Sequence, residues 1–537
     1  MSIRRSAISG IAAVVLALGV AELSAGLLAG APSPLDALGQ QVVGLLPGGV
    51  LTFAIETFGT ANRAVLTAVS VLVASGLGAA MGVASRDSMT PALGAFLLVA
   101  VVAFFASLSQ PGAGAASVLA VLVLAVVTGL GLLVRLRDTA MAIPPAEPAA
   151  AVATQAPAAG SVPAPATERS PRHGDGTERD DRGRRSFLRM ALGGVTVGAV
   201  SGIIGRGLLG GGGGPLVDPA GLALPAPQRP LSAVPASADL ARELPGVAPL
   251  FTPNDDFFRI DTAIAVPQID PAGWTMRVHG MVERELVLDY DGLLSRPMRE
   301  VDATISCVSN EVGGDLVGNA RWLGVPLRDL LEEAGPSTGA EQVMGRSVDG
   351  WTGGFPLELA LDGREALVAV AMNGEALPVR HGFPARLVVP GIYGYVSATK
   401  WLAGIELTTW DVDGYWVPRG WSKEGPVKTM ARIDVPGPDG SVDPGATTVA
   451  GVAWAPTRGI SRVELRVDEG EWREAELLDA LSEDTWVQWR LVLELAAGVH
   501  EVTVRAIDGE GDLQPQGPRP PAPDGAEGWH SIRVRAG

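Results

Sequence analysis

Cys307 is the only cysteine in this chain of 537 residues. It follows the β-type run Val301–Ser306, so it lies where a strand turns into a loop. A single thiol excludes an intramolecular disulfide and a metal cage of several cysteines. Its thiolate is a soft donor that suits a transition metal, with the remaining ligands supplied by a cofactor. Two other interpretations are a small buried hydrophobe and a nucleophile paired with His381.

Further segments follow one another in order around Cys307. Asn310 lies three residues after the cysteine, and Arg321 begins the segment Arg-Trp-Leu-Gly-Val-Pro-Leu. The others are Thr-Pro-Asn-Asp-Asp-Phe-Phe at 252–258, Met-Asn-Gly-Glu-Ala-Leu-Pro at 372–378, His-Gly-Phe-Pro-Ala-Arg at 381–386 and Lys-Trp-Leu at 400–402. This ordered series, within residues 250–537, resembles the sulfite oxidase family of molybdenum enzymes.

The resemblance implies a molybdenum ion bound by the dithiolene of one molybdopterin and by one protein thiolate. Cys307 matches that thiolate, as metal ligand and as the catalytic centre's only protein donor. An anionic phosphate in an acidic protein needs local donors, and Arg and Lys supply them. The same matching assigns contacts with the cofactor to Asn254, Asp255, Phe258, Thr352, His381, Arg386 and Lys400.

The implied reaction is a two-electron oxygen-atom transfer, with a small-molecule oxo donor or acceptor as substrate. Tyr393 and Tyr395 are the candidates for assisting the coupled proton transfer. Glu311 and Val312 stand where sulfite oxidases carry sulfite-binding arginines. A carboxylate beside a dianion costs roughly 1 kcal/mol or more, which disfavours sulfite. The segment from Gly391 looks closer to exported bacterial relatives, including the methionine sulfoxide reductase catalytic subunit.

Charge divides the chain into two parts. Residues 1–214 carry 14 basic and 11 acidic residues, whereas residues 215–537 carry 27 and 47. The net charge of −17 leaves no basic face for phosphates, so nucleic acid is excluded as a partner. Two parts with such different balances are expected in different surroundings.

Five apolar runs approach the length of about 20 residues that a bilayer crossing needs. They lie at roughly 7–30, 64–84, 91–109, 115–134 and 187–209. We expect a four-span membrane region at 1–137 and a fifth span at 184–214. Residues 42–58 are expected to form a loop or an interfacial helix, because Pro47 and two glycines interrupt them. Buried helices of a soluble core are the alternative.

The positions of the arginines predict the topology, because basic residues stay on the cytoplasmic side. They predict a multi-pass protein of the cytoplasmic (inner) membrane whose residues 210–537 face the extracytoplasmic side. Residues 138–183 are rich in Pro and Ala and then in charges, which predicts a disordered cytoplasmic linker. Arg184–Arg189 resembles a twin-arginine export signal; an ordinary positive flank is the alternative. Gly210–Gly214 would be a tether.

The second half divides at residue 426. Residues 215–425 are expected to form the molybdopterin-binding catalytic domain, with a helix at 321–335 and a buried strand at 386–391. Alternating strands at 426–537 predict an immunoglobulin-like sandwich that implies a possible homodimer. Five tryptophans are expected in its core: Trp454, Trp472, Trp486, Trp489 and Trp529.

The predicted fold is therefore a membrane region of about five helical spans, an α+β molybdopterin domain of the sulfite oxidase type and a β-sandwich. The histidines lie outside the apolar runs, so a haem held in the membrane by two histidines is improbable. Electrons would pass to or from a separate carrier, such as a cytochrome or a quinone-linked protein. Two other functions remain open: a true sulfite dehydrogenase and a cofactor-free, membrane-anchored binding protein.

Overall fold

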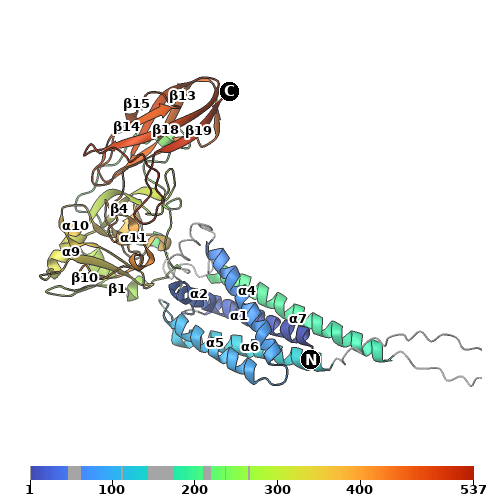
Figure 1. Cartoon of the computed structure of the whole chain (residues 1–537). Coiled ribbons are helices and arrows are strands. Elements are labelled where there is room, and N and C mark those ends of the chain that lie inside the picture. The colour runs from blue at the N-terminus through green and yellow to red at the C-terminus, as the bar shows by residue number, and fades with distance from the viewer. Residues whose placement is uncertain are drawn as a thin grey trace, which may run out of the picture. The chain divides into compact units, whose positions relative to one another are not determined.

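The computed structural model describes residues 2–28, 30–45, 62–110, 113–142, 175–209, 219–235, 238–263 and 266–537. These residues divide into two compact units, a helical unit that ends at residue 209 and a β-rich unit that begins at residue 219. Figure 1 shows the helices and strands of each unit, coloured along the chain.

The helical unit is built from apolar helices. They are α1 (Ile3–Leu27), α2 (Pro34–Leu45), α4 (Asn62–Ala84), α5 (Thr90–Leu108), α6 (Ala115–Met141) and α7 (Asp175–Gly207). In all of these except α2, a stretch is long and apolar enough to cross a membrane: Ile3–Leu27, Val65–Ala84, Thr90–Leu108, Ala115–Met141 and Gly183–Gly207. The prediction of five long apolar helices is thus confirmed.

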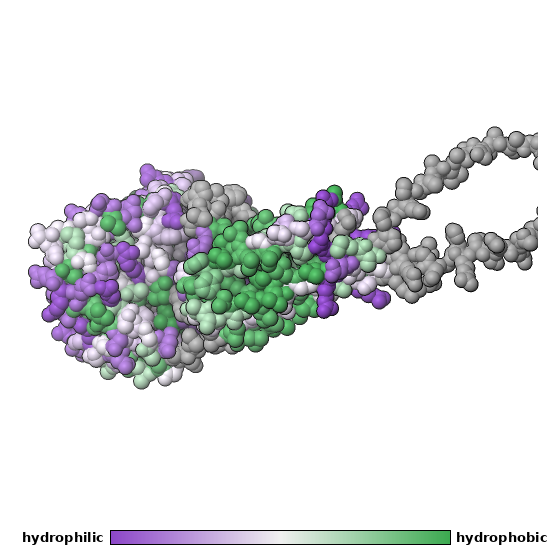
Figure 2. All heavy atoms as spheres, turned by 90° about the horizontal axis from the view of Figure 1, so that it is seen from below, coloured by the Kyte–Doolittle hydropathy of each residue, from purple (hydrophilic) through white to green (hydrophobic). Residues whose placement is uncertain are grey.

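The outer faces of these helices are apolar. Leu72 is 70% exposed, Phe105 is 67% exposed and Ile203 is 73% exposed. Figure 2 shows a continuous hydrophobic band over the helical unit, with hydrophilic side chains gathered at one end of the band. Such a surface is unfavourable in water, because its apolar area stays exposed to the solvent.

Glycines bring α1 into backbone contact with its neighbours. A Cβ atom added to Gly10 would lie 1.9 Å from the carbonyl oxygen of Gly78 in α4. A Cβ added to Gly19 would lie 1.8 Å from the carbonyl oxygen of Gly198 in α7. Small residues permit this close approach of helices. Helix α1 is therefore packed between α4 and α7.

Helix α7 begins earlier than the composition indicated. It starts at Asp175, so residues 175–183 are helical rather than part of an unstructured linker. Helix α6 also runs to Met141, so the first residues of the expected linker are helical as well. Residues 143–174 of the linker, the expected tether at Gly210–Gly214 and most of the segment 42–58 lie outside the described residues.

One mixed sheet and one antiparallel sheet form the first part of the β-rich unit. One has the order β2-β1-β10-β5-β6, and the other has the order β3-β4-β7-β8 with β9 paired to β7. Their bounds are β1 (Thr275–Gly280), β2 (Leu286–Asp289), β3 (Arg299–Ser306), β4 (Val317–Pro326), β5 (Gln342–Ser347), β6 (Thr352–Pro356), β7 (Leu367–Met372), β8 (Glu375–Ala376), β9 (Arg386–Val388) and β10 (Leu402–Thr408). Four short helices join them: α8 (Tyr290–Leu294), α9 (Leu327–Ala334), α10 (Leu357–Leu361) and α11 (Gly394–Ser397).

The helix expected at 321–335 begins only at Leu327. Residues 321–326 belong to strand β4, where Trp322 and Val325 are buried and pair with β7. Tertiary pairing therefore outweighs helical periodicity in this segment. The helix ends where the sequence indicated, because Gly335 has a φ of 71° that suits glycine.

The last part of the chain forms two antiparallel-rich sheets packed face to face. Their strands are β11 (Met430–Val435), β12 (Gly440–Val442), β13 (Gly445–Trp454), β14 (Ile460–Val467), β15 (Arg473–Glu474), β16 (Glu476–Leu477), β17 (Val487–Leu495), β18 (Gly498–Asp508) and β19 (His530–Ala536). The sheet orders are β11-β13-β17-β16 and β12-β19-β18-β14-β15. Alternate residues of both sheets, such as Val449 and Val504, fill one core.

The five tryptophans of this region do not share one environment. Trp489 lies in the sandwich core as expected, whereas Trp454 and Trp486 are buried in a separate cluster that also contains Val308. Trp472 and Trp529 are only partly buried, and their ring centroids lie 5.0 Å apart. The guanidinium of Arg505 lies 3.9 Å from the ring centroid of Trp472. Cation–π stacking on the sheet surface therefore accounts for two tryptophans that were expected in the core.

Candidate active site

A cavity opens beside Cys307, at the end of strand β3. Its lining includes Cys307, Arg386 and Lys400, which come from three separate segments of the chain. Aromatic side chains make up much of the remaining wall, namely Phe257, Phe258, Trp351, Tyr395, Trp401 and Trp416. The fold therefore brings one soft sulfur donor and two cationic side chains to one apolar-walled space.

The loop after β3 presents Cys307 to this cavity. The Cys307 amide donates to the Leu316 carbonyl at 2.9 Å, and the Asn310 amide donates to the Cys307 carbonyl at 3.1 Å. The Asn310 side-chain oxygen accepts a hydrogen bond from the Leu316 amide at 2.8 Å. Asn310 thus shapes the loop. Burial raises the pKa of the Cys307 thiol, and hydrogen bonding with Ser309 opposes that rise.

The C-terminal sandwich supports the same strand from behind. The Thr304 amide donates to the Asp484 carbonyl at 2.9 Å, and the Trp486 amide donates to the Thr304 hydroxyl oxygen at 2.7 Å. Val308, next to Cys307, shares a buried apolar cluster with Trp454 and Trp486. The sandwich therefore fixes the backbone that carries the cysteine.

Arg386 is a buried cation that lacks a counter-ion. It is 4% exposed, and it forms no ion pair within the described part of the chain. One guanidinium nitrogen donates to the His381 carbonyl at 3.1 Å, and the group lies 5.1 Å from the ring centroid of Trp322. Burial lowers its pKa to about 10. An unpaired buried charge is costly, so this position suits a bound anion.

Lys400 lies in the same cavity but has a protein partner. Its ammonium is 3.0 Å from a carboxylate oxygen of Asp261 and 3.2 Å from the Ile260 carbonyl oxygen. Burial is the main cause that lowers its pKa, to about 8, while Asp261 opposes the shift. Lys400 therefore adds a hydrogen-bond donor rather than a full unpaired charge.

His381 lies behind the cavity wall rather than on it. It is fully buried, its Nε2 is 2.9 Å from the Asn254 carbonyl oxygen, and its Nδ1 has no hydrogen-bond partner among the described residues. Burial lowers its pKa to about 3. A buried nitrogen without a partner is unusual in a folded protein and leaves one position for an added group.

The loop at 252–258 reaches this region through its backbone. Asn254 donates from its side chain to the Met372 carbonyl at 3.2 Å and accepts from Asn373 at 2.9 Å. Phe258 lines the cavity and stacks on Phe257, with ring centroids 5.3 Å apart. Asp255 instead has a fully solvent-facing side chain that pairs with Arg380.

The remaining predicted residues are more scattered. Thr352 begins β6 and does not line the cavity. Tyr395 does line it, but its hydroxyl donates to the Ser422 carbonyl at 2.7 Å. The Tyr393 hydroxyl accepts from the Lys428 amide at 3.4 Å and is also outside the lining. Burial raises the pKa of both tyrosines, that of Tyr393 to about 12.

Sequence reasoning missed Asp349, Trp351 and Trp416, which all line the cavity. The resemblance assigns only Thr352 in this part of the chain, whereas the acidic Asp349 in the turn between β5 and β6 is the more informative signal. Glu311, which had been expected near the substrate, is exposed and does not line the cavity. The carboxylates that do line it are Asp261 and Asp349.

These residues fit a large anionic, metal-binding cofactor better than a bare ion. The described residues contain no group of three or more His, Cys, Asp or Glu side chains placed to hold a metal. A lone thiol therefore needs donors that are not amino acids, and the unpaired Arg386 in the same cavity needs an anion. A molybdopterin with its phosphate meets both requirements.

Comparison with known proteins agrees with this chemistry. Residues 263–416 match the model of the oxidoreductase molybdopterin binding domain. The chain is 29% identical to sulfite oxidase of Gallus gallus over 344 residues, which covers 55% of this chain and 73% of that protein. For mitochondrial sulfite oxidase of Drosophila melanogaster the identity is 30%, but only 59% of that protein is covered.

A bacterial protein supplies a closer local match. The uncharacterized oxidoreductase YuiH of Bacillus subtilis (strain 168) is 35% identical over 156 residues, which covers 29% of this chain and 76% of that protein. The sulfane dehydrogenase SoxCD from Paracoccus pantotrophus aligns with 53% of this chain and 81% of its own, at 22% identity and a TM-score of 0.47, and we build nothing on it. From the sequence matches, the chain belongs to the sulfite oxidase family of molybdopterin-dependent oxidoreductases, enzymes with a molybdenum–molybdopterin cofactor.

Proposed function

We propose that this protein is a membrane-anchored oxidoreductase that transfers an oxygen atom to or from a small molecule outside the cytoplasmic membrane. The observation that carries the proposal is the shared cavity of Cys307 and Arg386. A soft donor and an unpaired buried cation there suit a metal and an anionic group of one cofactor. The bound molybdenum cofactor supplies two-electron oxygen-atom transfer.

In this proposal Cys307 is the protein's metal ligand, and Arg386 and Lys400 bind the phosphate end of the pterin. His381, held by the Asn254 carbonyl, does not line the cavity, and its unpartnered Nδ1 is what supports a contact with the cofactor. Phe258 contributes an apolar wall. Asp255, Thr352 and Tyr393 are the weakest members of the proposed set, because their side chains are turned elsewhere or do not line the cavity.

The helical unit supports membrane anchoring. Its five apolar helices have the length and composition to cross a bilayer, and their outer faces carry exposed Leu, Ile and Phe side chains. Arginine placement supports an orientation with the catalytic half outside the cytoplasm.

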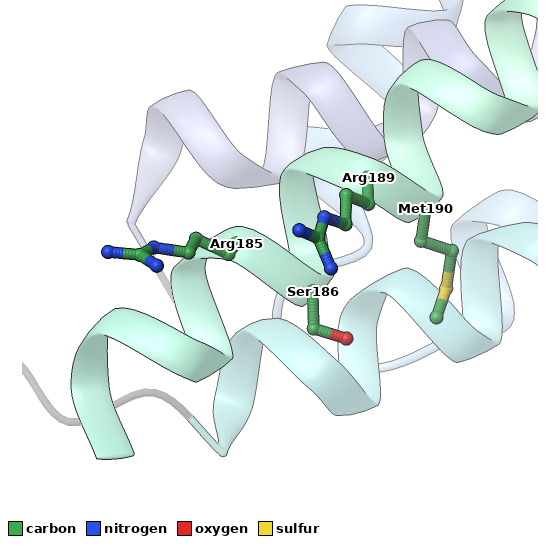
Figure 3. A pocket seen from close by; sticks show the side chains of 4 residues that line it. All are labelled: Arg185, Ser186, Arg189 and Met190. Carbon is green, nitrogen blue, oxygen red and sulfur yellow. The ribbon is translucent and has the colours of Figure 1, made fainter. Parts of the chain in front are cut away.

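The arginine-rich start of α7 supports export of the second half. Figure 3 shows Arg185, Ser186, Arg189 and Met190 along this part of the helix, where they line a shallow surface hollow. Phe187 between them is 2% exposed and packs with Ala12 and Leu136. We interpret the segment as a twin-arginine-like signal that stays in the protein as its fifth span. A carrier of folded proteins suits a domain that receives its cofactor first.

The two packed sheets at residues 430–536 support an immunoglobulin-like sandwich. By resemblance to the family, this domain would form a homodimer. Electron exchange with a separate carrier is supported by the family relationship, and a cytochrome or a quinone-linked protein is our proposed partner. A true sulfite dehydrogenase or oxidase is the second candidate, because the two animal relatives reported above are named sulfite oxidase.

Metal and pterin analysis of the purified full-length protein tests the proposal. We expect about one molybdenum and one pterin per chain, and the Cys307→Ser variant should fold but lose turnover. Wild-type protein without molybdenum or pterin, produced in cells that make the cofactor, would favour a cofactor-free binding protein. Sulfite oxidation with cytochrome c, measured on the loaded enzyme, distinguishes the sulfite dehydrogenase.

A further inference from the structure

Two residues of the C-terminal sandwich hold the loop that carries Cys307. Arg432 lies on strand β11, and its guanidinium donates to the Gly314 carbonyl at 2.8 Å. His530 begins strand β19, and its ring packs on Gly313 so closely that a Cβ added to this glycine would overlap the ring. The two strands belong to different sheets of the sandwich. Both sheets therefore contact one short segment that follows Cys307.

Arg432 reaches this segment from a fixed position. Its Nε donates to a carboxylate oxygen of Asp434 at 2.6 Å, and the second oxygen of that carboxylate accepts from the Ala248 amide at 2.9 Å. The side chains of Arg432 and Asp434 are only 12% and 7% exposed. An ion pair with these additional hydrogen bonds and little contact with solvent favours a single geometry.

His530 joins the two sheets through its ring. Its Nδ1 accepts a hydrogen bond from the Ile433 amide at 3.0 Å, which requires an unprotonated nitrogen. Burial is the main cause that lowers the pKa of His530; the charge of Arg432 adds to this shift, and that of Asp434 opposes it. The neutral ring is therefore the form that packs on Gly313. That glycine has a φ of 78°, a conformation that a side chain would strain.

The held segment contacts the side chain that shapes the cysteine loop. A Cβ added to Gly314 would lie 2.6 Å from the Asn310 side-chain oxygen, so the backbone packs directly on that amide. The same oxygen accepts from the Leu316 amide at 2.8 Å. The Leu316 carbonyl in turn accepts from the Cys307 amide at 2.9 Å. A series of direct contacts thus leads from Arg432 to Cys307.

We propose that Arg432 and His530 are positioning residues for Cys307, which set the direction in which its sulfur meets the bound metal. They act by holding Gly313 and Gly314, and neither of them lines the cavity. This inference rests on the proposed function, in which Cys307 is the metal ligand. Groups behind a metal ligand tune the site by fixing the orientation of that ligand. The sandwich thus acts on the metal site through the backbone of the cysteine loop.

Alkylation of Cys307 in the cofactor-free, full-length protein tests the role of Arg432. Iodoacetamide reports on this loop alone, because the chain has no second cysteine. Arg432→Met should raise the alkylation rate by roughly 10- to 100-fold, which corresponds to one lost charge-assisted hydrogen bond. Arg432→Lys should keep part of the protection. The matched control is Arg533→Met, exposed on β19. Equal rates in R432M and wild type would overturn the role.

The dependence of the rate on urea separates a loosened loop from a less stable protein. Below the unfolding transition, alkylation through a local opening should change little with urea, whereas alkylation through global unfolding rises steeply with it. We expect the first behaviour for R432M, and the second would contradict positioning of the loop.

Gly313→Ala and His530→Ala test the second contact as a pair. The added methyl group of the first variant overlaps the His530 ring, and the second variant removes the ring, so each should be alkylated faster than wild type. In the double variant the overlap is absent, and the two effects should not multiply. Effects that do multiply would refute the contact.

The molybdenum-loaded protein gives a readout at the metal itself. R432M and H530A should shift the visible thiolate-to-metal absorption at unchanged molybdenum content, and Arg533→Met should not. If the loaded variants absorb as wild type does, the positioning role is wrong while the proposed function stands. Wild-type protein without molybdenum, produced in cells that make the cofactor, contradicts the proposed function and this role together.

Discussion

The Trp486 amide donates to the hydroxyl oxygen of Thr304 at 2.7 Å, which ties the C-terminal sandwich to strand β3, the strand that ends just before Cys307. The same hydroxyl donates to the Asn319 side-chain oxygen at 3.1 Å, so Thr304 satisfies two buried groups at once. The sandwich therefore helps to hold the candidate active site in place.

Thr304→Val should loosen this connection. The substitution keeps the shape of the side chain but leaves the Trp486 amide without its acceptor, which costs about 1–3 kcal/mol. We expect a lower free energy of unfolding in urea and a reduced molybdenum content, because the cysteine loop is less well held. Thr275→Val, exposed on strand β1, is the control. Unchanged stability and full molybdenum loading in T304V would contradict this support.

Arg386→Met should have different effects on the cofactor-free protein and on the cofactor-loaded protein. Without a cofactor, removal of an unpaired buried cation should leave stability unchanged or raise it. With a cofactor, loss of a charge-assisted contact of about 1.5–3 kcal/mol should weaken retention by roughly 10- to 100-fold. Pterin release during dialysis measures the second effect. Arg328→Met, on the exposed side of α9, should behave as wild type.

His381 should make the cofactor-free protein sensitive to acid. Burial lowers its pKa from 6.5 to about 3 in the folded state. At pH values between these two, His381 is protonated in the unfolded chain but neutral in the folded chain. Stability should therefore fall as the pH decreases from about 7 towards 3. The stability difference between wild type and His381→Asn, followed by urea unfolding across this range, isolates the contribution. A difference independent of pH would rule it out.

Gly19→Val should disrupt the contact between α1 and α7. An added Cβ would meet the Gly198 carbonyl oxygen at 1.8 Å, so the helices must separate. We expect the thermal unfolding midpoint in detergent to fall by roughly 5 °C or more, since such overpacking costs about 1–3 kcal/mol. Gly131→Val is a matched control, because a Cβ there meets nothing within 4 Å. Equal midpoints for the two variants would refute the packing.

The prediction from sequence was most successful where the local sequence alone determines the structure. Long apolar runs predict the five long helices, and a cysteine at the end of a β-type run predicts that Cys307 lies in the loop after β3, where it lines the cavity. The prediction failed where contacts between distant segments of the chain determine the structure. The segment Arg321–Pro326 was predicted to begin a helix, but it belongs to strand β4, which pairs with β7. Trp472 was predicted to lie in the core of the sandwich, but its ring lies against the guanidinium of Arg505. Asp349 escaped notice because its surroundings come from three distant segments.

The glycine contact of α7 with α1 has a consequence for the order of events in biogenesis. Helix α1 is made first, α7 follows it, and the residues of the cavity come after α7 in the chain. If the carrier of folded proteins inserts α7, the first helices stand incomplete until the loaded enzyme arrives. The helical bundle is then completed only when the folded, cofactor-loaded enzyme has been exported.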